Sequence, residues 1–460
     1  MEYSRSHILG IPRELRNQIY KNYTRVEGGY IYDPDNNTMV CSDGTTIDLA
    51  LMFVCQQIAS ELKGLAFEHN SITFRTVPMV GRRAAMYDDL IKEHYQSQTR
   101  SLMYIDQQFT SRAMDDITRP HLHNHYIRTY LNEQRRPFGQ TIPADELGQG
   151  WGCAPSLQRS LVASTLEEAT KHPEFSSGDW FARQLCTNFE PWAVPSSDDI
   201  AWLLSMVQGD YSPTDDSCRR ARYSAATAAI AFLWSISADM RVHIRKVLLD
   251  EDASSIAFPE CHAEGLLPFF RENPRLFVER KVHVWHTMFN HSTVRVTLHG
   301  AALHQYPFDE EDDDAATRLV KPLSIWLAEA RELMARHIPA GSFRLTLEGG
   351  LCPDEDHWAF EAVMHDAAWQ IAFETALAQG GLTIPRWADT IKNRCFVRVG
   401  FPELYQELAT GSHLLKCNFE IPVVEEGVVE AILAENEGRL PAEWQQNWFR
   451  HRPASAPPYC

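Results

Sequence analysis

The start of the fold is decided by ILGIPRELRNQIY, at residues 8–20, and by LALMFVCQQIASEL, at residues 49–62. Pro12 suits the first turn of a helix, where its missing N–H loses no hydrogen bond. Apolar side chains then recur every four residues, which predicts a helix with one apolar face. These side chains are Ile11, Leu15 and Ile19. The second stretch has similar spacing, so we expect a small helical module at the N-terminus.

Strands are expected on either side of the second stretch. Residues 30–40 read as a short hairpin around a turn-rich Asp-Pro-Asp-Asn, and residues 71–77 alternate like a strand. From about residue 84 to 135 the pattern is helical and polar. Residues 136–156 are rich in Gly and Pro and read as a loop or linker. A second helical block is expected over roughly 156–240.

After residue 240, strand-like runs alternate with helices, which is typical of a mixed α/β domain. The expected strands are residues 243–249, 276–286, 293–299, 343–347, 394–399 and 414–421. The clearest helices are expected at 318–337 and 357–378. The predicted fold class is therefore α+β: a helical N-terminal module, a helical middle and a mixed α/β C-terminal domain. In residue numbers these are 1–80, 81–240 and 241–450, followed by a mobile tail at 451–460.

The composition restricts the partners that the protein can have. The chain has 460 residues, 44% of them hydrophobic, and a formal net charge of −18. A surface this acidic repels phosphate backbones and anionic lipids, so we expect a protein partner, no nucleic acid and no membrane. No apolar run is long enough to span a bilayer, and the first residues lack the apolar core of a signal peptide. The ten cysteines are scattered, which favours reduced thiols and a cytoplasmic or nuclear location.

Two groups of histidines are candidate metal ligands. His121, His123 and His125 would share one face of a strand, but no fourth zinc ligand follows at motif spacing. Solvated histidines explain this group better. His283 and His286 would point to opposite faces of a strand, which prevents a shared site.

Other chemical signals are weaker. Adjacent residues such as Cys261 and His262 rarely place a thiol and an imidazole in productive geometry. The acidic LCPDEDH of residues 351–357 suits the start of a helix. No phosphate-binding loop, dinucleotide fingerprint, nucleophile elbow or H-E-x-x-H zinc motif is present. The sequence therefore indicates no catalytic, cofactor-binding or metal-binding residue, and it favours a protein that is not an enzyme.

The N-terminal stretches resemble those of a large group of uncharacterised fungal proteins with an F-box-like N-terminus. In that group a Pro-x-Glu-Leu-Arg-x-x-Ile-Tyr helix is followed by a Val-Cys-x-Gln-Ile-x-x-Glu helix, and then by an Asn and a Phe-containing strand. The matching residues here are 11–20, 54–61 and 70–74. Residues 244–252, 259–269 and 272–276 look like further blocks of the same family.

An F-box-like module implies binding to the adaptor subunit of a cullin-type ubiquitin ligase, with the C-terminal domain holding a target. The chain departs from the pattern in its long segment between the two helices and in the missing Trp after Val-Cys. The leading hypothesis is an intracellular protein-interaction adaptor. The alternatives are a structural or regulatory protein without a ligase link and a metal- or cysteine-dependent enzyme. In the leading hypothesis the partner-binding residues are Ile11, Pro12, Leu15 and Ile19.

Overall fold

A computed structural model describes residues 8–79, 82–119, 125–128, 131, 141–142, 154–175, 180–206, 221–289, 315–382, 384–385 and 395–453. A seven-stranded sheet of order β11–β9–β8–β7–β3–β1–β2 organises them. Its strands are β1 Tyr30–Asp33, β2 Thr38–Cys41, β3 Ser71–Arg75, β7 Lys246–Glu251, β8 Phe277–His283, β9 Phe343–Glu348 and β11 Leu415–Cys417. Two small sheets pair β4 Val77–Pro78 with β6 Arg222–Tyr223, and β5 Thr141–Ile142 with β10 Ile384–Pro385.

The sheet joins the beginning of the chain to its second half. Strands β1 and β2 form the expected hairpin, with an antiparallel pairing. All other neighbours in the sheet run parallel, including β3 beside β7, where Ser71 pairs with Lys246. Parallel pairing needs a long connection, and here the helical middle of the chain provides it.

Helices surround the sheet and extend from both of its ends. The N-terminal helices are η1 Ile8–Gly10, α1 Arg13–Thr24, η2 Ala50–Phe53, α2 Gln56–Leu62 and α3 Leu65–His69. The middle of the chain forms α4 Arg82–Gln108, α5 Ser111–Thr118, α7 Pro155–Lys171, α8 Trp180–Gln184, α9 Ser197–Met206, α11 Ala225–Ser235 and α12 Ala238–Arg241. The rest are η3 Pro259–Leu266, α13 Leu267–Glu272, η4 Val284–Met288, α15 Ala315–Ala335, α16 Pro353–Ala378, α18 Phe401–Thr410, α19 Glu426–Glu435 and α20 Pro441–Arg450.

One face of the sheet forms the main core. Alternate residues of β7 and β8 are buried, among them Val247, Leu249, Val278 and Val282, as the two-residue repeat of a strand requires. They pack with apolar residues of α11, α15 and α16. The intervening residues are only partly buried and carry many charges, so they form a polar face.

The expectation of a mixed α/β fold is confirmed, and four strands of the seven-stranded sheet, β7, β8, β9 and β11, lie between residues 240 and 425. The strand expected at 293–299 lies outside the described residues. The expectation of a strand at 394–399 is wrong, because the described residues 395–399 form no strand. Gln370 explains why: its amide accepts from Val397 N at 2.8 Å and donates to Arg398 O at 2.6 Å. This side chain takes backbone groups that a strand would give to a neighbour.

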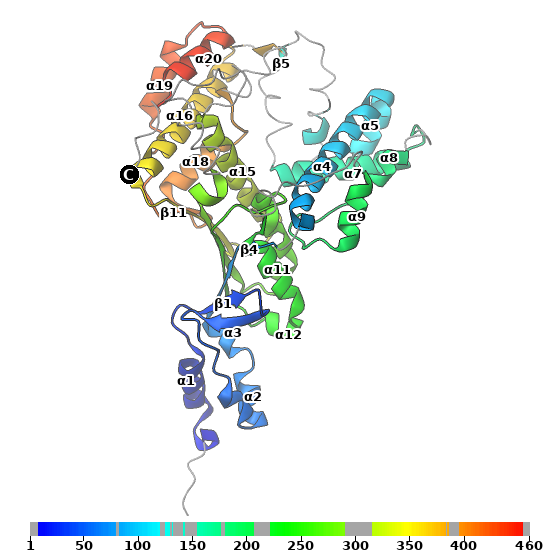
Figure 1. The fold of residues 1–460 in the computed structure, drawn as a ribbon. Coiled ribbons are helices and arrows are strands. Elements are labelled where there is room, and N and C mark those ends of the chain that lie inside the picture. The colour runs from blue at the N-terminus through cyan, green and yellow to red at the C-terminus, as the bar shows by residue number, and fades with distance from the viewer. Residues whose placement is uncertain are drawn as a thin grey trace, which may run out of the picture.

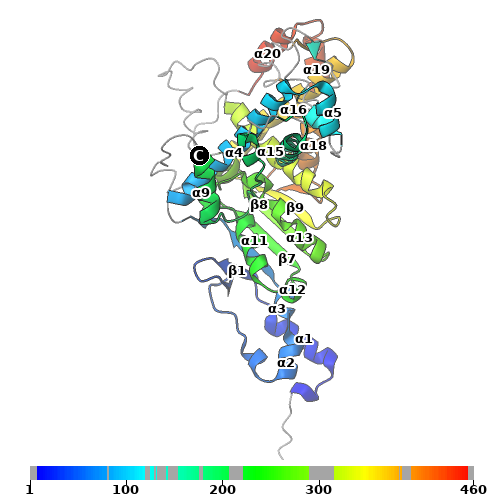
Figure 2. The same cartoon turned by 90° about the vertical axis from the view of Figure 1, so that its right-hand side faces the viewer.

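The molecule is elongated, with the sheet near its middle. Helices α1 and α2 form one tip, and α19 and α20 lie at the opposite end (Figures 1 and 2). In the part of the chain that the structure describes, no helix combines the length and hydrophobicity needed to cross a membrane.

Candidate functional site

Helix α1 buries its polar side. Arg16, Tyr20 and Thr24 are at most 9% exposed. The Arg16 guanidinium donates to both carboxylate oxygens of Glu61 in α2, at 2.9 and 2.7 Å, and the Tyr20 hydroxyl donates to the same carboxylate at 2.9 Å. A two-point arginine–carboxylate contact is among the strongest polar contacts in proteins, so it fixes how α1 is turned on α2.

The Glu61 carboxylate is the centre of this contact. Besides Arg16 and Tyr20, it accepts from Gln57 at 3.1 Å and pairs with Arg13 at 2.6 Å. Hydrogen bonding to Arg16 is the main reason that the pKa of Glu61 is well below its usual range, so the group stays ionised. Arg16 also donates to Ile11 O at 2.6 Å, which ties the residues before α1 to the same cluster.

The apolar residues of α1 consequently lie on its outer side. Leu15 and Ile19 are 49% and 39% exposed, Pro12 is exposed, and Ile11 is partly buried. We call Pro12, Leu15 and Ile19 the apolar α1 face. The core of this module is made instead by Tyr20 with two α2 residues, Ile58 and Leu62.

Two more exposed apolar side chains lie at the end of η2 and directly after it. Tyr23 follows Leu15 and Ile19 at the same four-residue spacing, and its hydroxyl accepts from Leu51 N at 3.1 Å. Just beyond that contact Phe53 is 84% exposed and Val54 is 63% exposed. The sequence places Val54 in an apolar helical stripe, so this exposure was not predicted. It arises because η2 ends at Phe53 and α2 starts only at Gln56, which breaks the stripe.

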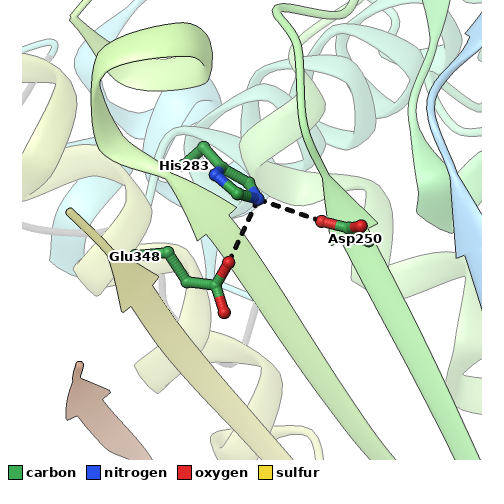
Figure 3. A group of neighbouring side chains, drawn as sticks. All are labelled: Asp250, His283 and Glu348. Carbon is green, nitrogen blue, oxygen red and sulfur yellow. Dashed lines mark hydrogen bonds and ion pairs between the residues drawn. The ribbon is translucent and has the colours of Figure 1, made fainter. Parts of the chain in front are cut away.

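A second candidate lies at the carboxyl ends of β7, β8 and β9. Asp250, His283 and Glu348 have ligand-type atoms within 4.8 Å of one another (Figure 3). The Nε2 atom of His283 is 3.1 Å from an oxygen of each carboxylate. In open α/β sheets, ligands commonly bind at the carboxyl ends of the strands, so these three side chains are a candidate metal site.

Two cations already occupy the carboxylates of this group. Lys281 Nζ is 2.8 Å from Glu348 Oε1, and Arg75 Nε is 3.4 Å from Asp250 Oδ2. Further along the same face, Lys246 and Arg344 both pair with Glu279. The Asp250–His283–Glu348 group is thus the last part of a series of ion pairs between neighbouring strands, which explains it without a metal.

The expectation that His283 and His286 point away from each other is wrong. The strand ends at His283, and the following π-helical segment η4 turns the chain. The two imidazole rings are therefore stacked, with centroids 6.1 Å apart. His121 and His123 lie outside the described residues, while His125 is exposed in the described segment 125–128.

Cys261 and His262 do not form a reactive pair. The His262 ring is buried, with Nε2 2.7 Å from Ala257 O and Nδ1 2.7 Å from Ser224 Oγ. Because a carbonyl only accepts, Nε2 carries the proton and Nδ1 accepts from the serine. Burial raises the pKa of the Cys261 thiol well above its usual value and lowers that of His262 to about 3. Both groups are neutral, and Ser224 is fully buried as the N-cap of α11.

Two further expectations concern the cysteines and the acidic stretch at the start of α16. Six described cysteines are free thiols, but Cys352 is disulfide-bonded, so the expectation of reduced thiols is wrong there. The acidic stretch begins α16, as predicted. Its Asp356 is buried and accepts from Gly350 N at 2.9 Å and from the Trp285 indole.

Comparisons of the chain with family models, curated proteins and solved structures find no match. The resemblance of the N-terminal stretches to an F-box-like module thus stays a prediction. The geometry supports a binding surface on α1 better than a reactive centre.

Proposed function

We propose that the protein is a protein-interaction adaptor that binds a partner through the apolar α1 face. The partner is the adaptor subunit of a cullin-type ubiquitin ligase, as the F-box-like residues imply, and the C-terminal domain holds a target protein. The observation that carries the proposal is the orientation of α1, which buries Arg16 and exposes Leu15 and Ile19.

A single exposed leucine is ordinary in a folded protein and would not indicate a binding surface. Here exposed apolar side chains lie at helical spacing on α1, and Phe53 and Val54 of the same N-terminal module are exposed as well. The buried contacts of Arg16 with Glu61 hold α1 in this orientation in the free protein. Such a preorganised surface loses little conformational freedom when a partner binds.

The location of the module fits the same role. Helices α1 and α2 form the tip of the molecule (Figure 1), so a large partner can reach them without meeting the sheet or the C-terminal helices. The opposite end, with α19 and α20, stays accessible to a target.

The test is binding of the purified ligase adaptor to the full-length protein, measured by calorimetry with wild type and Leu15→Ala. If Leu15 is a binding hot spot, the substitution weakens binding by about 1–2 kcal/mol or more. Its free energy of unfolding should change by only about 0.5 kcal/mol, because the site is exposed. Leu351→Ala is the matched control, since Leu351 is fully exposed and far along the chain from α1.

Three results would count against the proposal. Wild type that binds no adaptor removes the ligase link and favours a structural or regulatory protein. An equal loss of affinity for the adaptor in Leu15→Ala and Leu351→Ala shows that binding does not use α1. A large loss of stability in Leu15→Ala shows that the side chain has a structural role.

A further inference from the structure

A cavity of about 410 Å³ lies where the helical middle of the chain meets the helices beside the sheet. Helices α4 and α7 and the loop after α8 form one side, and α11, η3 and α13 form the other. Its volume falls in the range of small-molecule sites. Its lining includes Tyr95, Arg159, Phe189, Trp192, Glu264 and Arg271.

Arg159 of α7 is the unusual member of this lining. Its guanidinium lies over the Phe258 ring, with the Cζ atom 4.2 Å from the ring centroid. The Nη2 atom is buried and has no hydrogen-bond partner among the described residues. A buried cationic donor without a partner is costly, so this atom indicates a missing acceptor.

The carboxyl groups near Arg159 do not supply that acceptor. Glu329 accepts from Ser156 N at 2.8 Å and from Ser156 Oγ at 2.6 Å, so both of its oxygens are engaged. Burial raises its pKa to about 7, and burial also raises the pKa of Glu260. Neither Glu329 nor Glu260 forms a hydrogen bond with the Arg159 Nη2 atom, so an acceptor for this atom has to come from elsewhere.

The remaining charges and walls define the kind of ligand. Arg271 lines the exposed rim and has no ion pair with a described residue. Glu264 pairs with Arg336 at 3.7 Å, but its Oε1 atom is buried without a hydrogen-bond partner among the described residues, so this wall favours a donor and the anionic group of a ligand belongs on the Arg159 side. Aromatic walls come from Tyr95, Phe189 and Trp192. The site thus combines a buried cation with surfaces suited to a flat apolar body.

We propose that this cavity binds a small organic anion, with its carboxylate or phosphate on Arg159 and its apolar body against the aromatic walls. The site is one of binding and not of reaction, because the neighbouring Cys261 thiol is protonated and donates to Phe258 O at 3.2 Å. This proposal is independent of the α1 face, which belongs to the distant N-terminal module.

The experiment uses the full-length protein and three probes of similar size: benzoate, phenyl phosphate and the neutral benzamide. Calorimetry should show saturable binding of benzoate, phenyl phosphate or both, and at least tenfold weaker binding of benzamide. The stronger of the two anions identifies the ligand as a carboxylate or a phosphate. Arg159→Gln should weaken the binding of that anion by about tenfold or more, because a charged hydrogen bond is lost. Arg159→Lys should restore part of the binding.

Two controls keep the result interpretable. Arg331→Gln removes a half-exposed arginine of α15 that does not line the cavity, and binding should be unchanged. Ser160→Trp fills space from an exposed lining position, so it should abolish binding even if Arg159→Gln fails to fold. Failure of both anions to bind wild type overturns the proposal. The proposal is also overturned if the anion still binds to Ser160→Trp, or if benzamide binds to wild type as tightly as the anions do.

Discussion

Arg280 and Glu251 form an ion pair that is sealed inside the protein, with side chains 1% and 0% exposed. The Arg280 Nε and Nη2 atoms donate to Glu251 Oε1 at 2.9 and 2.6 Å. The other carboxylate oxygen accepts from Ala225 N at 2.9 Å, at the start of α11. Arg280 also donates to Pro259 O at 2.6 Å in η3. The pair therefore connects β7 and β8 to two helical segments that cover the sheet.

Removing the cation of this pair should be strongly destabilising. Arg280→Met leaves Glu251 buried and without its counterion, which typically costs about 3–5 kcal/mol. Lys246→Met is the control, because Lys246 pairs with Glu279 at 3.4 Å from a half-exposed position. That change should cost about 0–1 kcal/mol. Urea unfolding of both variants measures the difference, and similar costs for the two would contradict the structural assignment.

Acid should destabilise the protein through its buried histidines. Burial lowers the pKa of His262 to about 3, so between pH 6.5 and 3 the unfolded chain binds a proton that the folded protein does not. Stability therefore falls as the pH is lowered through this window, by about 3 kcal/mol at pH 4 from His262 alone. Burial lowers the pKa values of His94 and His365 to about 4, which acts in the same direction.

The measurement is urea unfolding at several pH values between 7 and 4. His262→Gln should lessen the dependence of stability on pH. Leu351→Ala, at a fully exposed position without a titratable group, should leave the dependence as in wild type. An unchanged slope in His262→Gln would show that this imidazole is protonated in the folded protein.

The orientation of α1 can be tested through Arg16 and Arg13. Both contact Glu61, but the Arg16 side chain is 9% exposed and the Arg13 side chain is 46% exposed. Arg16→Met should speed hydrogen exchange of the α1 amides, because the helix loses the contact that holds it on α2. Arg13→Met should have a smaller effect. Exchange in β7 should stay unchanged in both, and equal effects of the two variants would argue against a special role of Arg16.

We expect the purified protein to hold no stoichiometric zinc. Lys281 and Arg75 already pair with the carboxylates beside His283, and the histidines at 121–125 lack a fourth ligand at motif spacing. Elemental analysis of protein prepared without chelators measures this directly. About one zinc per chain that is lost in His283→Ala would assign a metal to the strand ends. Loss in His121→Ala or His125→Ala would assign it to the other histidines instead.

The local parts of the fold were predictable from the sequence. Alternating apolar residues gave β8, and the turn residues after β1 gave the hairpin with β2. The pairing of β3 with β7 was not predictable. Periodicity shows which face of a strand is buried, but it does not show which distant strand lies beside it. For the same reason the sequence separated residues before 80 from those after 240, although one sheet contains strands of both.

The candidate sites show a similar limit. Periodicity identified Leu15 and Ile19 as one face of a helix, but it could not show that the opposite face would be buried. That outcome depends on Glu61, a residue of another helix whose charge pairs with Arg16. Arg159 gave no sequence signal either, because its lack of a partner is a property of the packed structure.

The parallel pairing of β3 with β7 has a consequence for biosynthesis. Thr76, next to β3, donates to Asp252, which follows β7 and lies 176 positions further along the chain. During translation the first three strands emerge long before β7 exists, so β3 has an unpaired edge until the second half is made. We expect the nascent chain to be most prone to aggregation in this interval and to need a chaperone then. Contacts this distant in sequence also favour slow folding.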